Sequence, residues 1–151
     1  MNTADTAFAH VVANLTEEAL RERPAAHDRS RVGVVGVATQ PDSDSVADSA
    51  AGAILAELVG RGAEVRYHDP HVPLFKDDSG YEHKGVTLDA LLHWADVLVI
   101  VTAHRAVEWD HLYASAELVV DTVNSVRGRT IRERQVLRLG AGWMIPDGSR
   151  A

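Results

Sequence analysis

The sequence predicts an α/β fold: a Rossmann-like three-layer domain with a mostly parallel sheet, preceded by an N-terminal amphipathic helix. Short β-branched and aliphatic runs recur along the chain, and segments with helical spacing of apolar residues separate them. These runs do not alternate polar with apolar residues, which is typical of strands buried on both faces of a parallel sheet. The length of 151 residues suits one domain.

The N-terminal segment has the apolar spacing of an amphipathic helix over residues 4–22, and Pro24 ends it. The expected apolar face consists of Phe8, Val11, Val12, Leu15 and Ala19. We assign residues 1–23 to this helical segment and residues 31–143 to the domain that contains the sheet. Because the apolar face needs a partner, we expect the helix either to pack back onto the sheet or to form a homodimer.

Four strands are expected to form the parallel part of the sheet. They are predicted at 32–37, 64–69, 97–102 and 118–122, with 136–139 as an edge strand. Helical segments are predicted at 46–59, 88–95 and 109–114, and a polar loop at 72–84. Right-handed crossovers between parallel strands then place helices on both faces of the sheet.

Composition excludes several kinds of function. The absence of cysteine rules out disulfides, thiolate metal sites and a cysteine nucleophile. The net charge of −7, without a cluster of Lys and Arg, argues against nucleic acid and anionic membranes as partners. No apolar run approaches the ~20 residues that a membrane helix needs, and no leader pattern opens the chain, so a cytoplasmic location is expected.

Polar residues follow the predicted strands at one edge of the sheet, where parallel α/β sheets bind their ligands. The candidate ligand-binding residues are Thr39, Gln40, Asp44, Ser45, Ser49, Asp69, Thr102, His104, Asp121 and Asn124. The glycines of residues 33–38 have the spacing GxxGxA rather than the GxGxxG of a dinucleotide fingerprint. We therefore expect a small-molecule ligand at this edge, but no NAD or other cofactor.

Histidines are unusually frequent, and several lie at the predicted strand ends. His68, Asp69, His71 and His104 are candidates for acid–base catalysis, because imidazole titrates near neutral pH. The spacing of His68 and His71, with a third ligand from His104 or Asp121, is only weakly specific for zinc, and no metal site is predicted. Of the other histidines, one is expected on the inner face of its helix, His93, and four at the surface, namely His10, His27, His83 and His111.

Taken together, four segments resemble the C-terminal, nucleotide-sugar-binding domain of the UDP-glucose/GDP-mannose dehydrogenases. The segments are VGVVGVATQPDSDSVADS (32–49), GAEVRYHDPHVP (62–73), ADVLVIVTAH (95–104) and VVDTVN (119–124). Residues 2–20 resemble the end of the long helix that leads into that domain. The resemblance implies a domain that closes over the nucleotide of a sugar donor.

Members of this family also have an NAD-binding domain and a central region with a catalytic cysteine, and this sequence shows neither. The resemblance therefore implies a nucleotide-binding or nucleotide-sugar-binding domain that is not a dehydrogenase by itself. The alternatives are a small enzyme with repurposed His and Asp acid–base chemistry, a non-catalytic partner subunit, and a folded domain that has lost its ligand.

The sequence departs from the family at residues that contact the ligand. Thr39 and Gln40 stand where the family has Phe and Lys, and Ala47 and Val123 stand where it has Arg. Losing two charged hydrogen bonds is expected to weaken a pyrophosphate ligand by about two to four decades.

Overall fold

Short buried strands build a six-stranded sheet at the centre of the chain. The computed structural model describes residues 3–23 and 27–146. In spatial order the strands are β2 (Glu64–His68), β1 (Arg31–Val35), β5 (Val97–Ile100), β6 (Val119–Asp121), β7 (Val136–Arg138) and β8 (Gly142–Trp143). All neighbouring pairs are parallel except β7 with β8. The predicted α/β fold with a mostly parallel sheet is thus confirmed.

The strand order reverses at β1, which lies between β2 and β5. Counting only the five parallel strands, the order is 2-1-3-4-5, the flavodoxin-like variant of the doubly wound fold. Crossovers on the two sides of β1 leave in opposite directions, which creates a switch point beyond the carboxyl ends of β1 and β5. This is the edge at which the sequence predicts a ligand.

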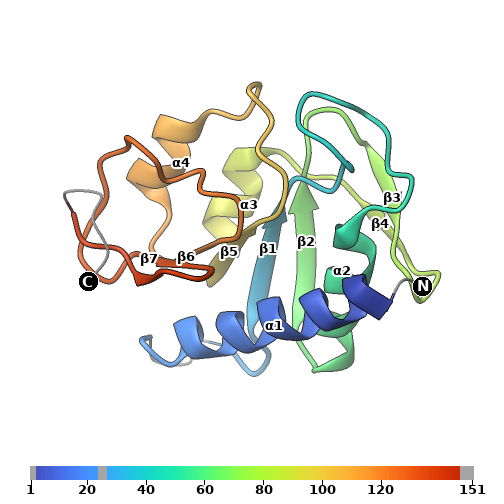
Figure 1. Ribbon diagram of the computed structural model, residues 1–151, viewed down its shortest axis with the longest axis horizontal. Helices are drawn as coiled ribbons and strands as arrows, with labels where there is room; N and C mark the ends of the chain where they lie inside the picture. Colours follow the sequence, from blue (N-terminus) through green and yellow to red (C-terminus); the bar gives the residue numbers. More distant parts are fainter. Residues whose placement is uncertain (1–2, 24–26, 147–151) are drawn as a thin grey trace.

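Two helices cover each face of the sheet (Figure 1). One layer contains α1 (Thr3–Leu20) and α2 (Ala50–Gly60), and the other contains α3 (Leu88–Trp94) and α4 (Trp109–Ser115). Strand β5 serves both layers, because Val97 and Val99 pack with α1 and α2 while Leu98 and Ile100 pack with α3 and α4. This double burial explains why β5 is apolar at every position.

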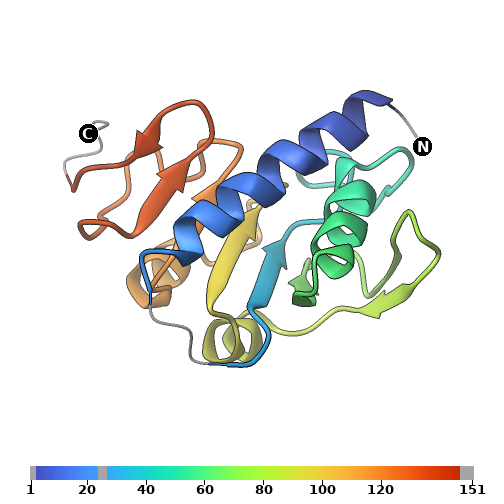
Figure 2. The ribbon, with the colours of Figure 1, turned by 90° about the horizontal axis from the view of Figure 1, so that it is seen from below.

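Helix α1 lies across the strands and shares a hydrophobic core with the sheet (Figure 2). Its buried residues are Ala9, Val12, Ala13, Thr16 and Ala19. Val11 was expected on this face but is 48% exposed, because the face that meets α2 and the sheet is centred on the small residues Ala9 and Ala13. Phe8 and Leu15 are partly buried against the same core. The chain therefore covers the apolar face of α1 itself, the first of the two predicted alternatives.

Some predicted boundaries were wrong. The helix predicted from residue 46 begins at Ala50, because Ser49 is its N-cap and accepts a hydrogen bond from the backbone N–H of Ala51. The predicted loop 72–84 contains a two-stranded hairpin, β3 (Leu74–Lys76) and β4 (Glu82–Lys84).

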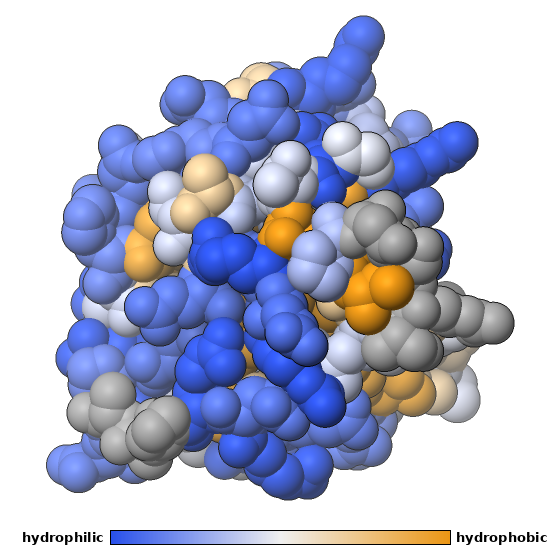
Figure 3. All heavy atoms as spheres, turned by 90° about the vertical axis from the view of Figure 1, so that its left-hand side faces the viewer, coloured by the Kyte–Doolittle hydropathy of each residue, from blue (hydrophilic) through white to orange (hydrophobic). Residues whose placement is uncertain are grey.

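The edge of the sheet also differs from the prediction. Strand β7 pairs on both sides, and the edge strand is β8, which has only two residues. The side of the molecule that carries α4, β7 and β8 is mostly hydrophilic (Figure 3). A strand of two residues at the edge exposes few backbone groups with which a further strand could pair.

None of the helices in the described part of the chain has the length and apolar character that a bilayer crossing requires.

Substitution of two neighbouring valines tests the packing of α1. Val12 is fully buried and Val11 is not, so Val12→Ala should lower the free energy of unfolding by about 2 kcal/mol. Val11→Ala should change it by less than about 0.5 kcal/mol. Urea denaturation followed by circular dichroism measures both values, and equal losses would show that α1 does not pack on this face.

Candidate functional site

The loops that follow β1, β2, β5 and β6 lie at the carboxyl edge of the sheet, the upper end of the strands in Figure 1. We call the loops 36–49, 69–73, 101–107 and 122–126 the edge loops. They contain every residue that the sequence predicts for ligand binding or catalysis except His68 and Asp121, the last residues of β2 and β6.

Gly36 is the first residue after β1 and lies directly against the loop after β5. Its φ is +85°, in the left-handed region, and a Cβ atom there would collide with the carbonyl oxygen of Thr102. The hydroxyl of Thr102 donates to the carbonyl of Ala38 at 2.7 Å. The glycine therefore permits a close approach of backbone to backbone at the switch point, which agrees with a packing role for this segment.

The carboxylate of Asp69 is buried among donors from three edge loops. Its Oδ2 accepts the N–H of Val37 at 2.8 Å, that of Ala38 at 3.1 Å and the Nε2–H of His104 at 2.8 Å. Its Oδ1 accepts the N–H of His71 at 2.8 Å. Burial by itself would raise the pKa of Asp69, but the hydrogen bonds from His71, Val37 and His104 outweigh burial and hold the pKa below its ordinary value.

His104 uses both ring nitrogens within the fold. Its Nδ1 accepts the backbone N–H of Asp42 at 2.8 Å, so Nδ1 has the lone pair and the proton is on Nε2, which donates to Asp69. The side chain is fully buried, and its ring orientation is fixed from both ends. A neutral imidazole with both nitrogens bonded has no free position for proton transfer to a ligand.

The four predicted catalytic residues do not form one cluster. The rings of His71 and His104 lie edge to face with their centroids 4.7 Å apart, next to Asp69. His68 is held separately, because its Nδ1 donates to the carbonyl of Val86 at 2.8 Å. The catalytic role of these residues stays a prediction.

Several predicted ligand-binding hydroxyls are engaged in holding loop 36–49. Those of Thr39 and Ser49 donate to the carbonyls of Ala47 and Val37, both at 2.6 Å. Together with Thr102, they fasten the loop to itself and to the loop after β5. A ligand that accepts hydrogen bonds, such as a phosphate, can meet these hydroxyls only if such bonds break. Gln40, Asp44 and Ser45, in contrast, are exposed on the outer part of the loop.

Asp121 and Asn124 have different roles at the end of β6. The carboxylate of Asp121 is fully buried and accepts N–H groups from Val123, Ser125 and Val126 at 2.9–3.1 Å. It closes the turn that follows the strand. Asn124, at φ +62°, is half-buried, and its amide makes no hydrogen bond to a residue that the structure describes. Asn124 is therefore available to a ligand, whereas Asp121 is not.

Two charged residues that the sequence analysis did not select lie at this edge. Arg105 donates to the Asp42 carboxylate from its backbone N–H at 2.8 Å and from Nε at 2.9 Å. The backbone hydrogen bond first, and then the guanidinium, hold the pKa of Asp42 below its ordinary value. The side chain of Arg105 is 90% exposed, so it can turn from Asp42 to a ligand at this edge. Its position directly after His104 was the available signal in the sequence.

Two histidines lie in environments opposite to those expected. His83, predicted at the surface, is buried and bonds Asp77 through Nε2 at 2.8 Å, because it is on the inner face of the β3–β4 hairpin. Burial tends to raise the pKa of Asp77, but hydrogen bonds from Ser79 and His83 keep it below its ordinary value. His93, predicted on the inner face of α3, is exposed and donates to the carbonyl of Asp89 in its own helix.

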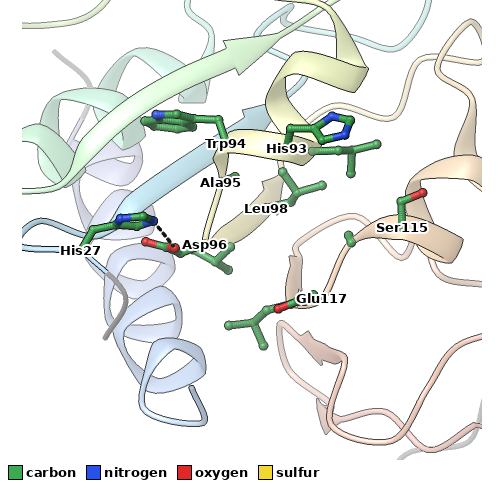
Figure 4. A pocket seen from close by; sticks show the side chains of 12 residues that line it. His27, His93, Trp94, Ala95, Asp96, Leu98, Ser115 and Glu117 are labelled. Atoms are coloured by element: carbon green, nitrogen blue, oxygen red, sulfur yellow. Dashed lines mark ion pairs between the residues drawn. The ribbon is translucent and has the colours of Figure 1, made fainter. Parts of the chain in front are cut away.

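A pocket at the opposite edge of the sheet does not suit an anionic ligand. It has a volume of about 250 Å³, and Figure 4 shows His27, Trp94, Asp96 and Glu117 among its lining residues. Both α3 and α4 end there, so the negative ends of two helices face the pocket. The ion pair of His27 with Asp96, at 3.4 Å, occupies one side. We therefore place the candidate site at the carboxyl edge.

The fold and the edge loops define a doubly wound α/β domain whose ligand edge lies at the carboxyl ends of its parallel strands. The chain belongs to the UDP-glucose/GDP-mannose dehydrogenase family: the model of the family's UDP binding domain matches residues 33–128. The matched residues lie within 31–143, the range predicted for this domain, and the match confirms the resemblance stated above. No curated protein matches the chain.

Several solved structures of sugar-nucleotide dehydrogenases have a similar fold over most of this chain. UDP-D-ManNAc dehydrogenase from Pyrococcus horikoshii has 25% identity and a TM-score of 0.62, over 82% of this chain and 28% of that chain. NDP-N-acetyl-D-galactosaminuronic acid dehydrogenase from Methanosarcina mazei Go1 has 22% identity and a TM-score of 0.64, over 86% and 28%. GDP-mannose dehydrogenase from Pseudomonas aeruginosa has 20% identity and a TM-score of 0.60, over 87% and 31%. The chain thus spans less than a third of the length of these enzymes.

Replacement of Gly36 tests the backbone contact at the switch point. Gly36→Ala should lower the free energy of unfolding by about 3 kcal/mol, because the left-handed φ and the collision with Thr102 both oppose it. Gly140→Ala is the matched control, since Gly140 has a φ of +78° with open space around it. The control should lose only about 1 kcal/mol. Equal losses in urea denaturation would show that the contact with Thr102 is unimportant.

Acid titration tests the role of Asp69. Its pKa is lower in the folded chain than the ordinary 3.8, so the carboxylate stabilises the fold above pH 3.8. This stability is lost as the pH falls from 3.8 through the lower folded pKa. Asp69→Asn should cost about 3 kcal/mol at pH 7 and make the loss of stability in acid shallower. The exposed Asp28→Asn controls for the removal of one charge. An unchanged slope of unfolding free energy against pH in Asp69→Asn would contradict this role.

Proposed function

We propose that the chain binds the diphosphate and nucleoside of a nucleotide or nucleotide sugar at the carboxyl edge of β1, β5 and β6. The observation that carries the proposal is the match to the UDP binding domain of the family. It spans residues 33–128 and so covers all the edge loops. The switch point between β1 and β5, where doubly wound folds bind ligands, lies at the same edge.

Pre-organisation of the edge supports this function. Asp69, Ser49 and Thr102 hold the backbone of loop 36–49 in one conformation before any ligand arrives. A ligand then loses less free energy in ordering the loop. The groups that remain available are exposed Gln40 and Ser45 on this loop, and Asn124 at the end of β6.

Electrostatics indicates that the affinity is weaker than in the rest of the family. Gln40, Ala47 and Val123 are uncharged where the resemblance implies Lys and Arg. Arg105 is the cation placed to meet a diphosphate, and it must leave the Asp42 carboxylate to do so. Because each charged hydrogen bond contributes about 1.5–3 kcal/mol, we expect a dissociation constant in the high micromolar to millimolar range.

Other predictions from the sequence remain open. For acid–base catalysis, His68 and His71 each keep at least one ring nitrogen without a hydrogen bond to a described residue, whereas both nitrogens of His104 are engaged. A role as partner subunit, a homodimer and a cytoplasmic location also stay predictions. Sedimentation velocity at micromolar protein tests the homodimer directly, and α1 presents exposed Val11 rather than its core face to a second copy.

A charge placed at Asn124 tests the nucleotide site. Asn124→Asp keeps the shape of the side chain and suits the left-handed φ, but it places a negative charge beside the bound phosphates. The dissociation constant for UDP or a UDP-sugar, measured by isothermal titration calorimetry, should rise about tenfold. Asn14→Asp on α1 adds the same charge away from the edge, and there the oxygen that accepts from Arg61 is retained.

The comparison between the two variants decides the proposal. Wild type and Asn14→Asp should bind with the same affinity. Absence of saturable binding of UDP, GDP and UDP-sugars by the folded wild-type chain would overturn the proposed function. Equal affinity in Asn124→Asp would show that the nucleotide lies elsewhere.

A further inference from the structure

We propose that Asp42, His71 and His104 bind one divalent transition-metal ion of the zinc class. Each side chain offers one ligand atom, and the three atoms lie within 4.8 Å of one another. They come from the loops after β1, β2 and β5, so the fold rather than local sequence brings them together. This ligand set differs from the HxxH pair of His68 and His71 in the sequence. His68 is not part of it, because its ring is directed to the carbonyl of Val86.

His104 is prepared for coordination by the group behind it. Its Nε2–H donates to the buried carboxylate of Asp69 at 2.8 Å. Histidines that ligate metals usually donate their other N–H to a carboxylate in this way, which fixes the ring and its neutral tautomer. The remaining nitrogen, Nδ1, has its lone pair directed toward the loop of Asp42. Nδ1 is therefore the ligand atom, and an ion there replaces the backbone N–H of Asp42.

Asp42 and His71 can adjust without disturbing the core. Asp42 is exposed and has a left-handed φ of +62°, a conformation that aspartate adopts more readily than most other residues. Its carboxylate accepts the backbone N–H of Arg105 through Oδ1 and the exposed guanidinium through Oδ2, and the guanidinium can return to water. His71 is half-buried, and its ring makes no hydrogen bond to a residue in the described ranges. An ion at this position would thus replace the guanidinium of Arg105 as the partner of the Asp42 carboxylate, and the backbone N–H of Asp42 as the partner of His104 Nδ1.

The donor set selects the class of ion. Two imidazole nitrogens and one carboxylate oxygen suit Zn²⁺, Co²⁺ or Ni²⁺, whereas Mg²⁺ and Ca²⁺ require sites built from oxygen. Three protein ligands leave a fourth position for water. The edge is acidic, with Asp44 and Asp48 on the same loop as Asp42, which favours a cation. The proposal does not depend on nucleotide binding, because the metal ion alone is the probe.

Cobalt titration of the untagged full chain tests the site. Wild type should bind one Co²⁺ per chain with visible d–d absorption, and Zn²⁺ should displace it. His71→Ala removes one ligand and should raise the dissociation constant for Co²⁺ at least about tenfold. His10→Ala is the matched control, because His10 is an exposed histidine on α1 and should leave the affinity unchanged. Mg²⁺ in excess should not compete.

Two outcomes would overturn the site. One is the same Co²⁺ affinity in His71→Ala as in wild type, and the other is no saturable binding by the folded wild-type chain at millimolar Co²⁺. Thermal unfolding followed by circular dichroism shows that each variant is folded. If His71→Ala does not fold, Asp42→Asn at the exposed loop gives the same comparison. An unchanged affinity in that variant would equally reject the proposal.

Discussion

The carboxylate of Asp69 holds together loops that the chain delivers from three different strands. It accepts two backbone N–H groups after β1, the N–H of His71 after β2 and the Nε2–H of His104 after β5. A buried carboxylate is stable only if donors replace the water that it loses, and these four groups do so. The conformation of loop 36–49 therefore depends strongly on this one side chain, together with the hydroxyls of Ser49 and Thr102 that also fasten the loop.

The same hydrogen bonds that make the edge rigid also withdraw polar groups from ligands. Asp121, Thr102 and His104 are polar residues at strand ends, yet each is saturated by the fold itself. Polar atoms at the carboxyl edge thus divide into an inner set that supports the loops and an outer set that solvent reaches. Arg105 and Asn124 belong to the outer set. We expect a ligand at this edge to contact the residues of the outer set.

The sequence predicted the parallel strands of the sheet well, because apolar strands such as β5 are dictated by burial on two faces. It could not predict the partners of polar side chains, which depend on contacts across the fold. His83 was predicted at the surface, and only the β3–β4 hairpin brings Asp77 into contact with it. Val11 was predicted on the buried face of α1 but is exposed, because helical spacing alone does not determine which residue is at the centre of that face. Arg105 was missed since its partner is distant in sequence.

Helix α1 has a consequence for the order in which the chain acquires its structure. It is the first element of the chain described in the structure, yet it contacts β5 and β6, which are separated from it by most of the remaining sequence. Contacts between such distant segments form slowly and late. The main contact of α1 is with α2, so part of the apolar face around Val12 is covered once α2 has formed. The rest of that face is covered only when β5 and β6 have joined the sheet, so the docking of α1 is completed late.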